Sequence, residues 1–272
     1  MHPTTITTII MDLDGTLLSS KRTVLPFTKK ILSELQKRGI LLGFASGRSA
    51  ASAQAFTDLF SSQLPLTLFN GSLIIDSISK EVLYSIHLDR TIVSELVRIT
   101  RNTSLHLHLY TENQVYLDME DALLYKKIDP ITYESCQPIE NMSNSNTLFI
   151  KAMITGDETE TLGWNILSDL EISHPNSFYA VSTFKNHIEI MNPLANKKNG
   201  LDLISRRHQI PLSSILAFGD ADNDREMLMS VGWGVAMGNC SPSLKAYVDD
   251  VTADNDSDGI GHYLANVFGL SS

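Results

Sequence analysis

Several features that define large classes of protein are scarce in this sequence of 272 residues. Its only cysteines, Cys136 and Cys240, are too few and too isolated for a disulfide framework, which favours a reducing compartment. No apolar run approaches the ~20 residues needed to cross a bilayer, and segment 1–10 has neither the basic start nor the apolar stretch of a signal peptide. We therefore expect a cytoplasmic protein without a membrane partner.

Basic charge is also scarce. The chain has 21 Lys and Arg against 31 Asp and Glu, giving a formal net charge of -10. A field of this sign repels nucleic acid and anionic membranes, so neither is expected as a partner, and an anionic substrate would need a local cation. The GxSxG elbow, the Walker loop and the GxGxxG fingerprint are missing too, which argues against serine hydrolases and nucleotide-driven motors.

Apolar strand-like segments alternate with segments of helical periodicity in the first and last thirds of the chain. The run ITTIIMD (6–12) is β-branched and apolar, as expected for a strand buried on both faces of a parallel sheet. Further strands are expected at 40–45, 66–70, 214–220 and 233–237, and helices at 26–38, up to about 60, at 199–208, at 224–232 and from 259. The alternation predicts an α/β fold: a doubly wound, Rossmann-like parallel sheet with its ligand crevice at the carboxyl ends of the strands.

Between about Val82 and Met191 the pattern changes to hairpin-like strands with helical segments among them. This predicts an α+β domain inserted at 82–191, with a discontinuous core formed by 1–81 and 192–272. Tyr110, Lys185 and His187 lie on segments of this insert, and ordinary surface positions are expected for them in preference to positions that reach the crevice.

Two acidic motifs follow predicted core strands. In Asp12-Leu13-Asp14-Gly15-Thr16 the alternation of an extended chain turns both carboxylates to one side while Leu13 packs away. Two acids in one pocket repel each other unless a cation lies between them, and Mg²⁺ prefers a few carboxylates with water and phosphate oxygens. The alternative is a solvated Asp-Gly turn, which the apolar strand in front of the motif disfavours.

The second motif, 219–224, brings three acids and Asn223 to another strand end. A calcium loop counted from Asp220 fails, because it requires Gly and Glu where Arg225 and Val231 stand. A helix N-cap at Asp222 or Asn223 is expected alongside a cation site. The similar run 254–259 predicts a polar loop with Asp258 near the cap of the last helix.

Cationic and hydrogen-bonding groups occur near other strand and helix ends. Ser46-Gly47-Arg48 lies at a strand-to-helix turn, where unpaired N–H groups favour a phosphate, although plain caps look alike. Lys197 or Lys198, before a predicted helix, can balance the carboxylates, and spacing alone does not choose between them. Asn70-Gly71 is interpreted first as a turn and second as a ligand contact. His106 and His108 share a strand face, which favours a polar face over a metal site.

Taken in order, DLDGT (12–16), SGR (46–48), NKKNGL (196–201) and GDADND (219–224) resemble the four motifs of the haloacid dehalogenase superfamily. The tail, GVAMGN (234–239) followed by LKAYVDDVTADNDSDGIGHYL, resembles its Cof-like, type IIB branch, in which an α/β cap is inserted between motifs two and three. The resemblance covers almost the whole chain. It implies a Mg²⁺-dependent phosphatase acting on a small phosphorylated metabolite, with the cap closing over the substrate.

By motif position, the resemblance implies that Asp12 is the nucleophile that forms an aspartyl-phosphate and Asp14 the general acid and base. It implies Mg²⁺ ligands from the Asp12 carboxylate, the Asp14 main-chain carbonyl and Asp220, with Asp224 either as a further ligand or as a carboxylate that supports the ligands from behind. The implied phosphate contacts are Ser46, Lys197 in preference to Lys198, Asn223, and the main-chain N–H groups of Leu13 and Gly47.

Two alternatives remain open from the sequence. A phosphomutase or phosphotransferase of the same fold would differ only in what accepts the phosphoryl group, and a non-catalytic metabolite-binding regulator would need no nucleophile. The sequence names no substrate among sugar phosphates, nucleotides and cofactor phosphates, and it leaves monomer and homodimer equally open.

Overall fold

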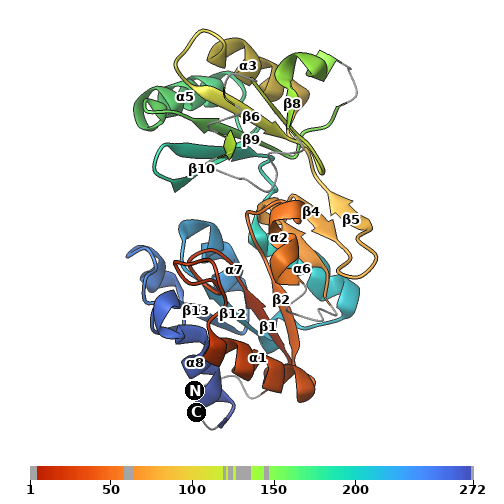
Figure 1. Ribbon diagram of the computed structural model, residues 1–272, viewed down its shortest axis with the longest axis vertical. Helices are drawn as coiled ribbons and strands as arrows, with labels where there is room; N and C mark the ends of the chain where they lie inside the picture. The colour runs from red at the N-terminus through yellow and green to blue at the C-terminus, as the bar shows by residue number, and fades with distance from the viewer. Residues whose placement is uncertain are drawn as a thin grey trace. The chain divides into compact units, whose positions relative to one another are not determined.

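The computed structural model describes residues 5–57, 64–118, 121, 125–126, 136–143 and 147–270 (Figure 1). The chain forms two compact units. Unit 1 comprises Met1–Gly47, Phe56–Leu83 and Asn196–Ser272, and unit 2 comprises Arg48–Ala55 and Tyr84–Ala195. The sequence had placed 48–55 in the core, whereas here this segment groups with unit 2.

A five-stranded sheet of order β14-β13-β12-β1-β2 forms the centre of unit 1. All four pairings are parallel. The strands are β1 (Thr8–Met11), β2 (Leu41–Phe44), β12 (Ile215–Gly219), β13 (Trp233–Ala236) and β14 (Asp250–Val251). Because β1 and β12 are neighbours in register, with Met11 opposite Phe218, the segments that follow them leave the sheet side by side.

Helices cover both faces of this sheet (Figure 1). They are α1 (Pro26–Lys37), α6 (Lys197–His208), α7 (Arg225–Ser230) and α8 (Gly259–Val267). Ile10 and Ala217 pack in one buried cluster with residues of α6 and α7. Phe218, which points to the opposite face because side chains alternate along a strand, makes an edge-to-face contact with Tyr263 of α8, with ring centroids 5.6 Å apart.

A small three-stranded sheet of order β3-β4-β5 lies beside β2, to which it is joined by a parallel bridge between Ala45 and Thr67. Its strands are β3 (Leu66–Leu68), β4 (Leu73–Ile75) and β5 (Val82–Ser85). The strand expected at 66–70 therefore ends at Leu68, and Phe69–Gly71 form a short 3-10 turn instead. The helix α2 (Ala50–Thr57) is described, whereas residues 58–60 of the helix expected to reach about 60 lie outside the described residues.

Unit 2 contains a six-stranded sheet of order β10-β11-β9-β6-β7-β8. The strands are β6 (His106–Tyr110), β7 (Val115–Leu117), β8 (Cys136–Pro138), β9 (Lys151–Thr155), β10 (Tyr179–Phe184) and β11 (His187–Met191). Leu107, Leu109 and the apolar residues of β9 and β11 in register with them form one cluster with residues of α3 (Arg90–Thr100) and α5 (Trp164–Ser173). The sheet is therefore apolar on the face that the two helices cover.

The opposite face of that sheet is polar. His106 and His108 share it, as expected, and so do Tyr110, Lys151 and Glu189, because these positions are in register with one another or two residues apart. Lys151 donates a 2.7 Å hydrogen bond to Glu189, and its ammonium group lies 4.7 Å from the centre of the Tyr110 ring. Tyr110 was expected at the surface but is buried, because it lies against this ion pair.

The α/β fold class predicted from the alternation of strands and helices is confirmed by the parallel sheet and its covering helices. Within the described parts of the chain, no helix combines the length and the apolar composition that crossing a bilayer requires.

Candidate active site

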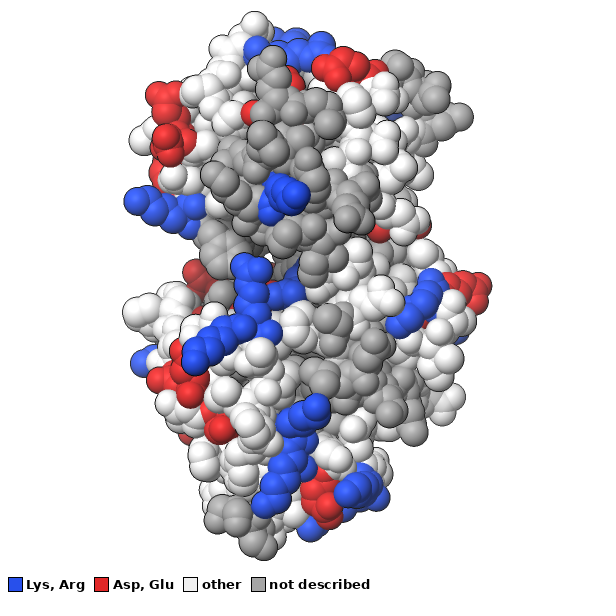
Figure 2. Space-filling view, in the orientation of Figure 1, with Lys and Arg blue, Asp and Glu red and all other residues white. Residues whose placement is uncertain are grey.

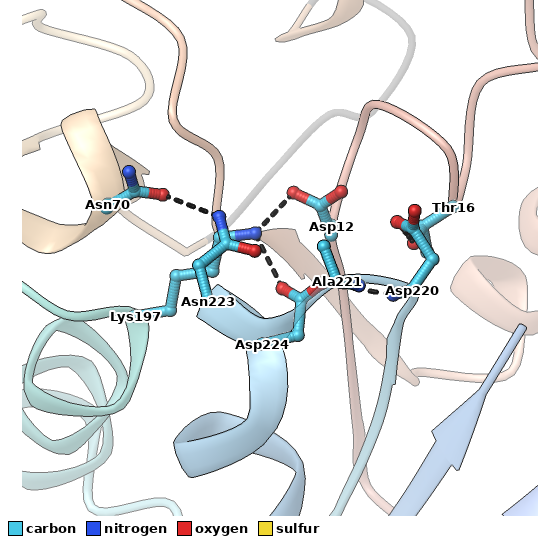
Figure 3. A network of polar contacts seen from close by, with 8 residues as sticks. All are labelled: Asp12, Thr16, Asn70, Lys197, Asp220, Ala221, Asn223 and Asp224. Atoms are coloured by element: carbon cyan, nitrogen blue, oxygen red, sulfur yellow. Dashed lines mark hydrogen bonds and ion pairs between the residues drawn. The ribbon is translucent and has the colours of Figure 1, made fainter. Parts of the chain in front are cut away.

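Three carboxylates from two strand ends and one helix start converge in unit 1 (Figure 3). Asp12 follows β1, Asp220 follows β12, and Asp224 directly precedes α7. One oxygen from each of the three lies within 4.8 Å of the others. The convergence is a consequence of topology, because parallel neighbours deliver their carboxyl ends to the same edge of the sheet.

Lys197 lies in the middle of this cluster. Its ammonium group donates hydrogen bonds of 2.6 Å to Oδ1 of Asp12 and 2.6 Å to Oδ1 of Asp224, and its side chain is only 1% exposed. Asn196 holds the start of α6 by accepting a hydrogen bond from the N–H of Asn199. Lys198 instead contacts Asp202 one turn further along the same helix, at 2.5 Å. The structure therefore places Lys197, and not Lys198, among the three acids.

Asp224 has both carboxylate oxygens engaged by protein donors. Oδ1 accepts a hydrogen bond from the Lys197 ammonium group, and Oδ2 accepts hydrogen bonds from the main-chain N–H groups of Asp220 and Ala221 at 3.0 and 3.1 Å. The carboxylate fits closely over Gly219, where a Cβ atom would lie 2.5 Å from Cβ of Asp224. Asp224, and not Asp222 or Asn223 as expected, occupies the N-cap position of α7, but its side chain makes no capping hydrogen bond to this helix because it folds back onto the strand end.

The loop after β1 reaches Asp220 through Gly15 and Thr16. The Thr16 hydroxyl donates a 2.7 Å hydrogen bond to Oδ1 of Asp220. Gly15 has φ +81°, and a Cβ atom there would lie 2.3 Å from Oδ2 of Asp220, so only glycine permits this approach. Leu13 is fully buried, as the alternation predicted, and Asp14 is half-buried.

Crowding of the acids shifts their proton affinities. Burial raises the pKa of Asp12 well above its ordinary value, Lys197 opposes this, and the charges of Asp224 and Asp220 add to it. Burial likewise raises the pKa of Asp220 to about 6, with Asp224 and Asp14 adding to the rise against the Thr16 hydrogen bond. Burial lowers the pKa of Lys197, but Asp12 and Asp224 outweigh it and raise that pKa, so the ammonium group stays charged.

The groups expected to contact phosphate lie on a neighbouring strand end and on the turn before α7. Ser46 is buried, and its N–H donates to the carbonyl of Thr67 at 2.9 Å. The Asn223 amide nitrogen donates to Oδ1 of Asn70 at 3.1 Å (Figure 3). Gly47 packs against the same Asn70 amide, because a Cβ atom on Gly47 would lie 3.3 Å from Oδ1 of Asn70. The structure therefore brings Ser46, Gly47 and Asn223 together around Asn70.

Sequence reasoning missed the support given by three residues. Thr16 belonged to the first motif but received no role, and Asn70 was interpreted mainly as a turn residue. Asn239 donates a 2.8 Å hydrogen bond from its amide to the carbonyl of Gly15, which holds the first loop from the far end of the chain. The GN pair at 238–239 was a signal for it, because Asn beside Gly after a strand often marks a turn that approaches another backbone.

The other candidate clusters do not converge. The described residues contain one group of three or more metal-type ligands within reach of each other, formed by Asp12, Asp220 and Asp224. His106 contacts Asp121 at 2.6 Å, and both ring nitrogens of His108 lack a hydrogen-bond partner among the described residues. The polar-face interpretation of the two histidines is therefore favoured over a metal site.

The chain is similar to known proteins in sequence. The sequence profile of the family described as haloacid dehalogenase-like hydrolase matches residues 9–264. The chain is 29% identical to the 5-amino-6-(5-phospho-D-ribitylamino)uracil phosphatase YitU of Bacillus subtilis, over 96% of this chain and 97% of that protein. It is 28% identical to the HMP-PP phosphatase of Serratia proteamaculans, over 93% of this chain and 92% of that protein.

Solved structures show the same fold. A haloacid dehalogenase-like hydrolase from Bacteroides thetaiotaomicron superposes with a TM-score of 0.83 at 23% identity, covering 97% of this chain and 100% of the other. The subclass IIB sugar phosphatase BT4131 gives 0.79 at 23% identity, covering 97% and 99%. The prediction of a hydrolase of this superfamily, of the phosphatase class, is confirmed. The chain belongs to the haloacid dehalogenase-like hydrolases.

Proposed function

We propose that the protein is a Mg²⁺-dependent phosphatase that hydrolyses small phosphorylated metabolites through an aspartyl-phosphate on Asp12. One observation carries the proposal: a buried, charged Lys197 between Asp12 and Asp224, with Asp220 in the same cluster. A phosphoryl group is anionic, so a site that handles it needs fixed positive charge next to the nucleophile. In a chain with a net charge of -10, this buried ammonium group supplies it.

The donor set fits Mg²⁺. Oδ2 of Asp12 and Oδ2 of Asp220 have no hydrogen-bond partner among the described residues, while the second oxygen of each is engaged by Lys197 or Thr16. These two oxygens belong to carboxyl groups whose pKa values are raised by burial and by the neighbouring acids. Such a pair favours a divalent cation between the two oxygens. We assign these two oxygens to the metal, together with the Asp14 carbonyl that the family resemblance implies. When bound, Mg²⁺ would neutralise charge on the phosphoryl oxygens and favour the ionised form of Asp12.

Asp224 is assigned a positioning role at the metal site. Its two oxygens already accept three N–H donors, from Lys197, Asp220 and Ala221. A carboxylate so occupied has little capacity left for a cation, but it fixes both the ammonium group and the backbone that carries Asp220.

The chemistry needs two carboxylates. The Asp12 carboxylate attacks phosphorus, an oxygen–phosphorus bond forms on Asp12, and the ester bond to the leaving oxygen breaks as Asp14 gives that oxygen a proton. Asp14 then takes a proton from a water molecule whose oxygen attacks the phosphorus, which releases phosphate and restores Asp12. Lys197, Ser46, Asn223 and the N–H groups of Leu13 and Gly47 hold the phosphoryl oxygens.

An aryl phosphate such as p-nitrophenyl phosphate tests the proposal without a known substrate. We expect phosphate release with Mg²⁺, none with a chelator, and a loss of at least ~10³-fold in Asp12→Asn, which removes the nucleophile. Asp254→Asn, the same change at an exposed acid of unit 1, is the control and should be neutral. Full turnover by the Asp12 variant would refute the assigned role.

Product analysis separates the alternatives. Inorganic phosphate as sole product supports hydrolysis, and a rearranged or transferred phosphate would indicate a mutase or transferase. Ligand binding without any turnover would indicate a regulator. We expect the substrate in the class of small phosphorylated metabolites, because the relatives are named for a ribitylaminouracil phosphate and for HMP-PP. A panel of such compounds, assayed with Mg²⁺ and with chelator, identifies it.

A further inference from the structure

The turn after β3 has an unusual backbone. Phe69, Asn70 and Gly71 all have positive φ, at 46°, 54° and 94°. Glycine adopts this region freely and asparagine tolerates it, but for phenylalanine it is strained. Such conformations persist only where the surroundings enforce them, and they cluster at functional sites.

Close packing enforces this turn. A Cβ atom on Gly71 would lie 2.3 Å from the carbonyl oxygen of Asn196, the residue that precedes Lys197. The N–H of Asn70 donates to the carbonyl of Ser46 at 2.9 Å. The turn is therefore fixed on one side to the start of α6 and on the other to the loop after β2.

The Asn70 side chain is directed at the candidate active site but hardly reaches solvent. It is 2% exposed, and its Oδ1 accepts the Asn223 amide nitrogen at 3.1 Å. Figure 3 shows Asn70 pointing towards Asn223, which lies beside Lys197. The same amide packs against Gly47, so that a Cβ atom there would lie 3.3 Å from Oδ1 and 3.4 Å from Nδ2. Asn70 thus touches both segments to which phosphate contacts are assigned.

We propose that Asn70 is a positioning residue that orients the Asn223 amide for phosphate binding. This inference rests on the proposed function. A phosphoryl group offers only acceptors, so the Asn223 side chain can contribute to binding it only through its nitrogen. Because Asn70 accepts one N–H of that nitrogen, it fixes which end of the amide lies on this side and leaves the second N–H for a phosphoryl oxygen. Without Asn70, a half-turn of the amide would present an oxygen that repels the phosphoryl group.

The test is Asn70→Gly, because glycine keeps the positive φ and the variant removes only the amide. We expect kcat/KM for p-nitrophenyl phosphate to fall about 10-fold, and inorganic phosphate to inhibit about 10-fold more weakly, as for the loss of one hydrogen bond to a bound anion. The Mg²⁺ concentration for half-activation should stay unchanged, since Ser46, Gly47 and Asn223, which Asn70 contacts, are not proposed metal ligands. Asn176→Gly, at φ 58° on an exposed turn of unit 2, is the matched control and should match the wild type.

A double-mutant cycle with Asn223→Ala decides whether Asn70 acts through Asn223. If it does, the double variant is no worse than Asn223→Ala alone. Multiplying losses, or an Asn70→Gly variant with wild-type kinetics and phosphate inhibition, would overturn the inference while leaving the proposed function intact. Absence of phosphate release by the wild type would overturn both. Circular dichroism and the thermal midpoint confirm that each variant is folded.

Discussion

Lys197 and Lys198 are adjacent in the chain and equal in charge, but the fold gives them opposite surroundings. Lys197 is enclosed by Asp12 and Asp224, whereas Lys198 is partly exposed and pairs with Asp202 on its own helix. Exposed pairs of this kind contribute little to stability, because water and salt screen them.

We therefore expect Lys197→Met to lose at least ~10²-fold in kcat, since it removes the charge beside the nucleophile and raises the pKa of Asp12 further. Lys198→Met should retain nearly full activity. Steady-state kinetics of the two variants at saturating Mg²⁺ measure the difference. Equal losses at both positions would contradict the assignment of Lys197.

His108 is a second residue whose surroundings dictate a measurable property. It is 0% exposed, its ring meets Tyr125 edge to face at 5.0 Å, and burial, with the charges of His106, His187 and Lys151, lowers its pKa to about 3. The neutral imidazole is the form that the folded chain tolerates.

The unfolded chain binds a proton at His108 near pH 6.5, and the folded chain does so only near 3, so this residue makes the fold less stable as the pH falls from 6.5 towards 3. Between pH 7 and 5 the loss is about 2 kcal/mol. His108→Phe should remove this loss of stability between pH 7 and 5, whereas His262→Phe, at an exposed position, should retain it. Urea unfolding at the two pH values tests this, and an unchanged pH dependence in His108→Phe would refute it.

At the scale of elements, the first and last helices of the chain cap each other. Leu25, the N-cap of α1, provides no side-chain cap, and Oδ1 of Asp258 instead accepts the N–H and the hydroxyl of Thr28, both at 2.8 Å. The Thr28 hydroxyl in turn accepts the N–H of Gly261 in α8 at 3.2 Å. Asp258 does occupy the N-cap position of α8, as expected, but its carboxylate caps α1.

We expect Asp258→Gly to destabilise the protein by about 1 kcal/mol, the typical contribution of a helix cap. Glycine suits the left-handed φ of 52° at this position, so the change isolates the carboxylate. Asp258→Asn keeps an acceptor and should cost less, and Asp254→Gly, four residues earlier in the same loop, serves as the control. A denaturation midpoint for Asp258→Gly equal to that of the wild type would contradict the role of the Asp258 carboxylate as a stabilising cap of α1.

For the molecule as a whole, the division into two units separates the proposed chemistry from the rest. Every residue assigned to the metal or to phosphate belongs to unit 1, whereas the buried Lys151 and Glu189 pair and His108 belong to unit 2. The net charge of -10 is not concentrated on the face seen in Figure 2, where acidic and basic side chains are interspersed. Because all the assigned metal ligands belong to unit 1, we expect a bound divalent cation to stabilise unit 1 and to leave unit 2 unchanged.

Saturating Mg²⁺, at about 100 times its dissociation constant, should stabilise unit 1 by about 2.7 kcal/mol. Amide hydrogen exchange should then slow in β1 and β12, which are followed directly by Asp12 and Asp220, and remain unchanged in β9 and β11. All samples contain Mg²⁺ but no substrate. Under these conditions Asp220→Asn should abolish the slowing of exchange in β1 and β12. Equal protection of both units, or protection that survives in Asp220→Asn, would contradict the assigned metal site.

Sequence pattern determined much of this protein. The apolar strand runs and the periodic helices predicted the parallel sheet, because a strand buried on both faces must be apolar throughout. The ends of those strands predicted where Asp12 and Asp220 would meet, since parallel neighbours end at one edge. Helix ends shifted by one or two residues, as at Lys37, because fraying and caps are set by contacts that periodicity does not contain.

Only the tertiary structure decided contacts between residues far apart in the chain. Asp224 closing over Gly219, Asn70 reaching Asn223, and Asp258 capping α1 each depend on backbone approaches that have no sequence period. The choice of Lys197 over Lys198 depended on a family resemblance at the level of sequence, and the fold supplies its physical reason. Charge and hydrogen-bonding capacity are local properties of a residue, but the partner that uses them is set by packing.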